Sequence, residues 1–319
     1  MRKFLPLFFM LTSLIAGQAF TQSDYPARPI RVVVGFAPGG ANDIIARLLS
    51  AKLQEAWGQS VVVENRVGAS GIIGMDFVAK SRPDGYTLLV MATGMVVNPA
   101  MYASLPYDTL RDFEPVTMLC SYPFVLVVNP SVPARSVKEL IQLAKSQPNK
   151  LNYSSPGSTQ QLSAELFRSR AGIDLVHVPY KGSVDAVNAL FSNDVQLTFL
   201  DPLGAAGPVR SGKLRALAVT SLQRSISMPD LPTMGESGIP DFDVTGWTSL
   251  FAPGGTPKPI VDKLHQQAVR TVHLPDIREK IVALGSEPVG NTPEQLREIV
   301  KVETNKWISV ARTANIKPE

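Results

Sequence analysis

Cysteine and histidine are scarce in this chain and the excess of positive charge is small. Each of these features argues against a class of function. Cys120 is the only cysteine among 319 residues, so an internal disulfide is excluded. The three histidines are His177, His265 and His273, and none lies close to another or to Cys120, so no metal-ligand spacing appears. The formal net charge is only +4 without a Lys or Arg cluster, which argues against a nucleic-acid partner. No cofactor is expected, so the fold must be stabilised by its apolar core.

Long apolar runs are also rare, and the one that stands out is at the N-terminus. Arg2 and Lys3 precede the apolar stretch Phe4–Ile15, and Gly17-Gln18-Ala19 supplies the small residues that a signal peptidase recognises. Because the run is too short for a typical membrane-spanning helix, a membrane anchor is the weaker alternative. We therefore predict a secretory signal peptide at residues 1–19, cleaved near Ala19, and a periplasmic mature chain.

The first informative stretch combines a strand, a glycine turn and a helix. Ile30–Val34 is a short run rich in β-branched residues, typical of a buried strand, and Pro38-Gly39-Gly40 interrupts it. From Ile44 to Trp57, apolar residues recur at helical spacing. A helix that begins just after a parallel strand directs its unpaired N–H groups into the crevice where such sheets bind ligands. These groups favour an anion, although a single Gly-Gly pair is more often a tight turn.

The same order of elements returns further along the chain. Leu151–Tyr153 is predicted to be a strand, and Ser154–Thr159 is a break rich in hydroxyl groups. The helix that follows is marked by Leu162, Leu166 and Phe167. A helix start surrounded by Ser and Thr is a polar, uncharged site for an anion. An ordinary N-cap would explain this segment alone, but the recurrence favours two anion-binding helix starts.

Strands and helices alternate along the rest of the chain, which predicts an α/β fold. Further strands are expected at Val61–Val63, Tyr86–Met91, Phe124–Val128, Asp174–Val178, Val195–Leu200, Ala216–Thr220 and Trp247–Ala252. Asn98–Val116 is expected to be irregular, and Ala216–Thr220 to return toward the first lobe. Because single cores stop growing near about 250–300 residues, we predict two lobes that close about a hinge, the architecture of a periplasmic solute receptor.

Long motifs throughout the chain resemble one known family. They are YPARPIRVVVGFAPGGANDIIARLL, VVVENRVGASGIIGMDFVAKSRPDGYTLL, LPYDTLRDFEPV, GIDLVHVPYKG, GKLRALAVTS, LPTMGESGIPDF and FAPGGTP. Together they resemble the tripartite tricarboxylate transporter substrate-binding family, also called the Bug family. The resemblance implies a two-lobed periplasmic-binding-protein fold of type II (Venus flytrap), each lobe a mixed sheet flanked by helices, with crossing hinge strands. We place lobe 1 at residues 24–122 and 225–319, and lobe 2 at residues 123–224.

The resemblance also implies a ligand and a site. Members of this family hold a small organic carboxylate through backbone N–H groups, hydroxyls and ordered waters at two helix starts. The corresponding residues here are Phe36, Pro38, Gly39, Gly40, Asn42 and Asp43 in the first loop, Thr93 and Gly94 at a third position, and Ser154, Ser155, Gly157, Ser158 and Thr159 in the second loop. Asp201 is a further candidate that would favour a ligand with an amino group, although a solvated loop acid is the plainer interpretation. Gln161 stands where family members often have His, which removes a titratable group near the second helix start.

Two classes of function remain open from the sequence. The favoured hypothesis is a receptor, without enzyme activity, that presents its carboxylate to membrane transporter subunits or to a sensor kinase. We expect a monomer. The alternative is a secreted enzyme that acts on a small carboxylate, although no Gly-x-Ser-x-Gly motif occurs, and Ser154 and Ser158 have no evident partner base. If backbone amides dominate binding, a bulky residue at Gly39 or Gly157 should abolish it, whereas Lys181→Ala should change it little.

Overall fold

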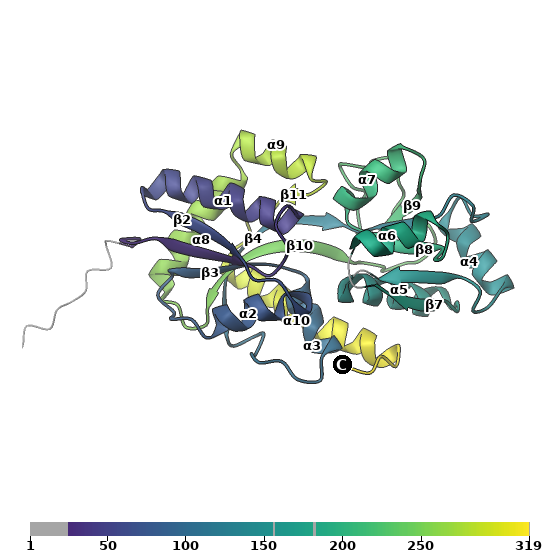
Figure 1. Cartoon of the computed structure of the whole chain (residues 1–319), viewed down its shortest axis with the longest axis horizontal. Helices are drawn as coiled ribbons and strands as arrows, with labels where there is room; N and C mark the ends of the chain where they lie inside the picture. The colour runs from purple at the N-terminus through teal and green to yellow at the C-terminus, as the bar shows by residue number, and fades with distance from the viewer. Residues whose placement is uncertain (1–24, 156, 181–182, 319) are drawn as a thin grey trace, which may run out of the picture.

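Two β-sheets lie one after the other along the long axis of the molecule (Figure 1). The computed structural model describes residues 25–155, 157–180 and 183–318, so the predicted signal peptide lies outside the described residues. Within them, one sheet has the strand order β11-β4-β10-β3-β1-β2 and the other the order β7-β6-β8-β5-β9. Among the described helices, none combines the length and the apolar character needed to cross a membrane.

Strands and helices alternate along the chain, although α3, β4, α7 and β11 were not predicted from the sequence, and the bounds of the elements are as follows. The strands are β1 (Ile30–Val34), β2 (Val61–Asn65), β3 (Thr87–Ala92), β4 (Phe113–Pro123), β5 (Val125–Val128), β6 (Asn152–Ser155), β7 (Val176–Pro179), β8 (Leu197–Leu200), β9 (Arg215–Val219), β10 (Thr245–Pro253) and β11 (Glu287–Pro288). The helices are α1 (Ala41–Trp57), α2 (Ile72–Ala79), α3 (Gly94–Met101), α4 (Val137–Ser146), α5 (Ser158–Ala171), α6 (Ser183–Phe191), α7 (Pro202–Arg210), α8 (Lys258–Val272), α9 (Pro275–Ala283) and α10 (Pro293–Thr313).

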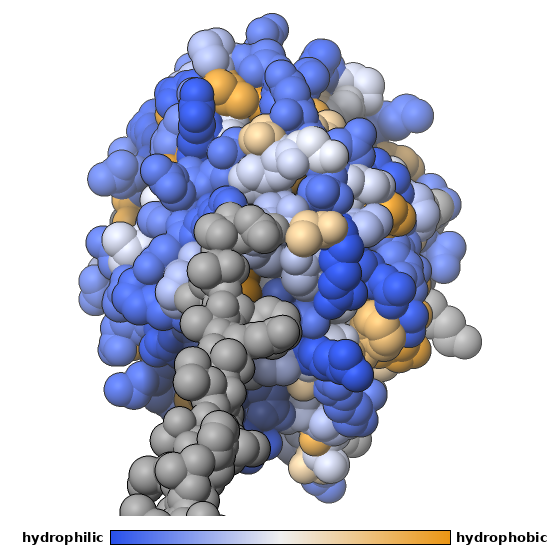
Figure 2. Space-filling view, turned by 90° about the vertical axis from the view of Figure 1, so that its left-hand side faces the viewer, coloured by the Kyte–Doolittle hydropathy of each residue, from blue (hydrophilic) through white to orange (hydrophobic). Residues whose placement is uncertain are grey.

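The first sheet is covered by helices on both faces. Its strand β1 pairs in parallel with β2 and β3, while β10 pairs antiparallel with β3 and β4. Val32 and Val34 pack with Leu49 of α1 and Leu264 of α8, whereas Val33 faces the cluster that α2, α3 and α10 contribute to. Burial on both faces explains why β1 reads as a continuous β-branched run rather than as an alternating one. Figure 2 looks onto the left-hand end of the molecule in Figure 1, where the surface is mostly hydrophilic with scattered hydrophobic residues.

The second sheet is also mixed. Strands β7, β6 and β8 run parallel, and β5 pairs antiparallel with β8 and β9. The expectation that Ala216–Thr220 returns to the first lobe is wrong, because β9 pairs with β5 inside the second sheet. The chain returns afterwards, through residues 220–244.

The chain crosses between the two sheets twice, from β4 to β5 at Phe124 and from β9 to β10 through residues 220–244. One buried threonine joins these two crossings. Phe124 separates β4 from β5, and its N–H donates to Thr220 Oγ1 at 2.8 Å. The Thr220 hydroxyl donates to the carbonyl oxygen of Val244 at 2.6 Å, just before β10. Because Thr220 is fully buried, this contact fixes both crossing segments side by side.

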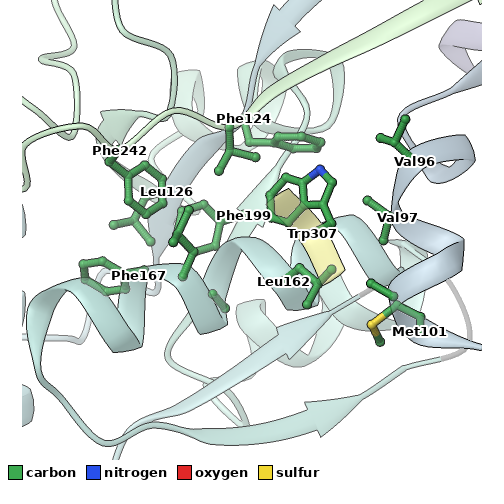
Figure 3. Packing of buried hydrophobic residues seen from close by; sticks show 14 of the residues in the cluster. Val96, Val97, Met101, Phe124, Leu126, Leu162, Phe167, Phe199, Phe242 and Trp307 are labelled. Atoms are coloured by element: carbon green, nitrogen blue, oxygen red, sulfur yellow. The ribbon is translucent and has the colours of Figure 1, made fainter. Parts of the chain in front are cut away.

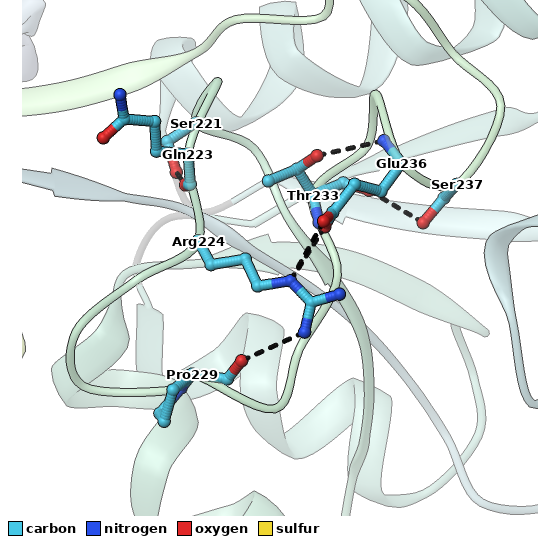
Figure 4. Close-up of polar contacts among 7 residues, drawn as sticks. All are labelled: Ser221, Gln223, Arg224, Pro229, Thr233, Glu236 and Ser237. Carbon is cyan, nitrogen blue, oxygen red and sulfur yellow. Dashed lines mark hydrogen bonds and ion pairs between the residues drawn. The ribbon is translucent and has the colours of Figure 1, made fainter.

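The long second crossing lacks regular structure but is held by hydrogen bonds. Arg224 Nε lies 3.0 and 3.1 Å from the two carboxylate oxygens of Glu236, and Arg224 Nη1 donates to the Pro229 carbonyl at 3.2 Å (Figure 4). Glu236 also accepts the N–H of Thr233 at 2.8 Å. The Arg224–Glu236 pair is about half exposed, so it orders the segment without stabilising it greatly.

A continuous apolar cluster links the two halves beside the crossings. Trp307 of α10 packs between Val97 and Met101 of α3 on one side and Leu162 of α5 and Phe124 on the other (Figure 3). Trp307 and Leu162 are fully buried. The two halves therefore share part of one core through α3, α5 and α10.

Three local expectations are corrected by the structure. Within the stretch Asn98–Val116 that was expected to be irregular, Asn98–Met101 belongs to helix α3 and Phe113–Val116 to strand β4, although Pro99 interrupts the hydrogen bonding of α3. Most of this helix is buried, and burial overrides its weak helical propensity. Helix α7 was not expected, because its sequence PLGAAGPVR contains two prolines and two glycines. Ser154 and Ser155 are the last residues of β6, not part of the break that follows it.

Candidate ligand-binding site

The strand ends that carry the two candidate loops lie next to the crossings. In the first sheet, β10 begins beside the end of β4, where Thr245 pairs with Pro123, and β3 runs antiparallel to β10. The carboxyl ends of β3 and its parallel neighbour β1 therefore point toward the second sheet. In the second sheet, Leu200 at the end of β8 pairs with Val125 at the start of β5, and β6 runs parallel to β8. Helices α1 and α5 accordingly begin at the facing ends of the two sheets (Figure 1).

The start of α1 presents free backbone donors. Gly40 is its N-cap, in an extended conformation, and no side chain caps the helix. Among the described residues, the N–H groups of Ala41 and Asn42 have no acceptor. Pro38, Gly39 and Gly40 are exposed, and Gly39 has a φ of +85°, a conformation that favours glycine. The loop therefore offers an open, donor-rich backbone of the kind that binds anions.

Asp43 is turned into the protein rather than toward a ligand. Its side chain is 3% exposed, and its Oδ2 accepts the Gly39 N–H and Arg47 Nε, both at 2.9 Å. Its Oδ1 accepts the Asn65 amide at 2.9 Å, and the same amide nitrogen donates to the Phe36 carbonyl at 2.9 Å. Burial alone would raise the pKa of Asp43, but the bonds from Arg47, Gly39 and Asn65 outweigh it and lower the pKa. Asp43 thus stays ionised and fixes the loop between Phe36 and the helix.

Two contacts tie the other candidates of this half to β10. Asn42 Oδ1 accepts the Thr248 hydroxyl at 2.6 Å, and Thr93 Oγ1 accepts the Trp247 N–H at 3.0 Å. A side chain at Gly94 would meet the tip of Met91 at 3.2 Å, so the chain passes close to the core there. Sequence reasoning did not assign Trp247 and Thr248 to the site. Their only sequence signal was their place in a strand expected near the crossing.

The start of α5 resembles the start of α1. Gly157 is its N-cap and no side chain caps it, so the N–H groups of Ser158 and Thr159 have no acceptor in the described part of the chain. The next residue with a partner is Gln161, whose N–H donates to the Gly157 carbonyl at 3.1 Å. Ser158 is half-buried and Thr159 is buried.

The two serines that precede this helix are engaged inside the second half. Ser154 is buried, and its carbonyl accepts the Thr198 hydroxyl at 2.7 Å. Ser155 Oγ lies 2.5 Å from His177 Nε2, on the neighbouring strand β7. The ring of His177 stacks on Tyr153, with centroids 4.9 Å apart. Sequence reasoning considered His177 only as a metal ligand, because the pairing of β6 with β7 is not visible in the sequence.

Asp201 is the N-cap of α7. It follows β8, and its Oδ1 accepts the Gly204 N–H at 2.8 Å. Burial raises the pKa of Tyr122 at the end of β4, and the charge of Asp201 raises it further. Leu200 pairs with Val125, so Asp201 lies at the crossing between β4 and β5. Helix capping accounts for one oxygen of Asp201, and its position at the crossing keeps it a ligand candidate.

The residues around the two helix starts do not form a recognisable catalytic arrangement within the described part of the chain. Among the described residues, no carboxylate hydrogen-bonds to His177, so the Ser155–His177 pair lacks the third member of a hydrolytic triad. Ser154 Oγ bonds the Ala186 carbonyl at 3.5 Å rather than a base. Within the same residues, no group of three His, Cys, Asp or Glu side chains is placed to hold a metal ion.

Comparison with known proteins decides the family. A sequence profile described as "Tripartite tricarboxylate transporter family receptor" matches residues 45–316. The chain belongs to this family. It is 38% identical to Protein BugT of Bordetella pertussis over 313 residues, which cover 97% of this chain and 96% of BugT.

Solved structures of the family share the architecture. R. palustris Rpa4515 with adipate is 37% identical, with a TM-score of 0.84, and the match covers 93% of this chain and 100% of that one. MatC from Rhodopseudomonas palustris with bound malate is 33% identical, with a TM-score of 0.79, and covers 90% and 100%. The expected two-lobed periplasmic-binding-protein fold is therefore confirmed, and this is a family of solute receptors rather than enzymes.

Proposed function

We propose that this protein is an exported receptor for a small organic dicarboxylate, bound between the starts of α1 and α5. Two solved relatives, Rpa4515 and MatC, are described with adipate and with bound malate, both of which carry two carboxylates. One helix start in each half would bind one carboxylate, and the ligand would connect the halves. The proposed contacts are Phe36, Pro38, Gly39, Gly40, Asn42, Thr93, Gly94, Ser155, Gly157, Ser158 and Thr159, with Asp43 and Ser154 fixing the loops and Asp201 at the margin.

The observation that supports this proposal is a difference among helix starts. Helices α4 and α10 are capped by the side chains of Ser136 and Thr292. Helices α8 and α9 have a proline in their first turn, which removes an unpaired N–H from each. The starts of α1, α2, α3 and α5 have neither device, and among these the starts of α1 and α5 lie at the facing ends of the two sheets (Figure 1). An anion supplies the acceptors that both starts lack.

Binding would be read by a membrane partner. A dicarboxylate that contacts both halves favours their closed arrangement, and a transporter or sensor subunit would recognise that arrangement. We further propose lobe 1 at residues 24–122 and 225–319 and lobe 2 at residues 123–224, since these ranges separate the two sheets. Export through residues 1–19 belongs to the same proposal.

A thermal-shift panel tests the proposal. The purified protein is heated with acetate, succinate, malate, adipate or citrate, and each acid is quantified by chromatography before and after overnight incubation. We expect at least one dicarboxylate to raise the melting temperature saturably, acetate to act weakly, and every acid to be recovered unchanged. Consumption of an acid would favour the secreted enzyme, and the absence of any shift would exclude the proposed ligand class.

A further inference from the structure

His177 lies beside the start of α5, and binding through backbone amides alone gives it no role. His177 lies on β7, an edge strand, with its ring against Tyr153 and its Nε2 2.5 Å from Ser155 Oγ. Ser155 is only 5% exposed and stands two residues before Gly157, the N-cap of α5. The ring therefore contacts Ser155, the residue that leads into the proposed ligand loop.

The direction of this hydrogen bond decides what Ser155 can offer. A serine hydroxyl has one proton to donate, and a neutral imidazole has one nitrogen that donates and one that accepts. If Nε2 accepts, the Ser155 proton is spent on the ring and only oxygen lone pairs face the loop. If Nε2 carries a proton, the ring donates to Oγ and the Ser155 proton is free to point toward the start of α5.

A carboxylate accepts hydrogen bonds and repels lone pairs, so it distinguishes these two states. We propose that His177 is a positioning residue for the dicarboxylate, and that its Nε2–H orients the Ser155 hydroxyl to donate to the bound anion. This inference rests on the proposed function, and it makes the affinity for the anion depend on the protonation of His177. Both the Nε2–H tautomer and the doubly protonated ring satisfy the arrangement, and an anion favours the charged form.

The surroundings of the ring make this coupling measurable. Burial lowers the pKa of His177, so the ring of the free protein is neutral near pH 7. Of the charged groups on the packed elements, Glu165 of α5 contacts the hydroxyl of Tyr153 at 2.6 Å, and Arg168 pairs with Glu165 at 3.0 Å. Asp185 of α6 is exposed. In the described residues no acid pairs with His177, so a bound anion would be the partner that raises its pKa.

The test compares four single variants and the double variant His177→Leu/Ser155→Ala, with adipate as the probe. His177→Leu removes the donor, Ser155→Ala removes the hydroxyl, His177→Gln keeps an N–H donor that does not titrate, and His273→Gln changes an exposed histidine of the other half. Affinity is measured by calorimetry at pH 5.5 and pH 8, in buffers of different ionisation enthalpy. Adipate's own titration is common to all variants and cancels in their affinity ratios.

We expect His177→Leu and Ser155→Ala each to weaken adipate binding about 10- to 100-fold at pH 5.5, and the double variant to lose little more. The wild type and His273→Gln should take up protons on binding and bind up to about tenfold more tightly, relative to His177→Gln, at pH 5.5 than at pH 8. Nitrogen-15 shifts of the His177 ring should report a protonated Nε2 in the complex. Melting temperatures of the variants identify any loss of folding.

The outcomes separate this inference from the proposed function. If the wild type binds adipate but a folded His177→Leu protein binds equally well, the role of His177 is contradicted and the receptor proposal stands. Nε2 found unprotonated in the complex also contradicts it. If the wild type binds no acid of the panel, the proposed function fails and this inference fails with it.

Discussion

The two helix starts of this protein are alike in backbone and unlike in what supports them. The loop before α1 is fixed by the buried carboxylate of Asp43, through its contacts with the half-exposed Arg47 and with Asn65. The loop before α5 is flanked by a hydroxyl and an imidazole, Ser155 and His177. The comparison indicates that the geometry of the first loop is insensitive to pH above the acid range, whereas the proposed role of His177 would make the donors of the second loop change as the pH falls below neutrality.

The largest effect should come from filling the space at a helix start. Gly157 has an extended φ of −173°, which any residue adopts, and among the described residues a Cβ there would come within 4 Å only of the flexible tip of Gln160. We therefore expect Gly157→Leu to lower the affinity for dicarboxylates at least about 100-fold, with an unchanged melting temperature, because the side chain would occupy the place of the anion. Unchanged binding in the thermal-shift panel would show that the anion does not lie at α5.

The matching change in the first loop should behave differently. Gly39 has a φ of +85°, so Gly39→Leu strains the backbone by about 1–2 kcal/mol besides covering the helix start. We expect loss of binding together with a lower melting temperature. Gly39→Ala is the control, since it carries the strain but little bulk. Equal stability of Gly39→Leu and Gly157→Leu would contradict the assigned backbone difference.

The next largest effect should come from removing the negative charge of Asp43, which fixes the first loop. Asp43→Asn keeps the shape of the side chain but weakens its bonds with Arg47 and the Gly39 N–H. We expect the free energy of unfolding to fall by about 1–3 kcal/mol in urea titrations at pH 7. Asp262→Asn, at an exposed pair with Lys258, is the control and should change little.

The same carboxylate predicts how this stabilisation depends on pH. The pKa of Asp43 is lowered on folding, so its contribution is complete above the unfolded value near about 3.9 and is lost as the pH falls through the lower folded value. The difference in unfolding free energy between the wild type and Asp43→Asn should therefore shrink below about pH 4. An equal difference at pH 3 and pH 7 would show that charge does not stabilise the loop.

The side-chain contacts that fix the two loops mark the limit of what the sequence could predict. Strand β1, its glycine turn and α1 follow from local pattern, because β-branched runs and helical periodicity are properties of neighbouring residues. Helix α3 was missed because its stability comes from burial, which overrides Pro99. The contacts Thr93–Trp247 and Asn42–Thr248 join residues more than 150 positions apart, and no local pattern encodes them.

The site shows the same division. The resemblance named the loop residues, but it did not distinguish those with free backbone donors from those already bonded inside the protein. Asp43 and Ser154 were predicted beside Gly40 and Gly157 as equal candidates. Only the spatial arrangement shows that the first two support the loops, because their partners Asn65 and Thr198 lie on other elements.

The smallest effect is expected at the nearest cation of the first loop, and it sharpens the comparison most. Arg47 is 52% exposed, so its pair with Asp43 is screened by water and contributes little to stability. If backbone N–H groups bind the ligand, Arg47→Ala should change dicarboxylate affinity less than about threefold, measured by calorimetry beside the exposed control Arg28→Ala. A loss comparable to that of Gly157→Leu would mean that a side-chain cation is the main anchor. In that case the likeness of the two helix starts would not explain binding.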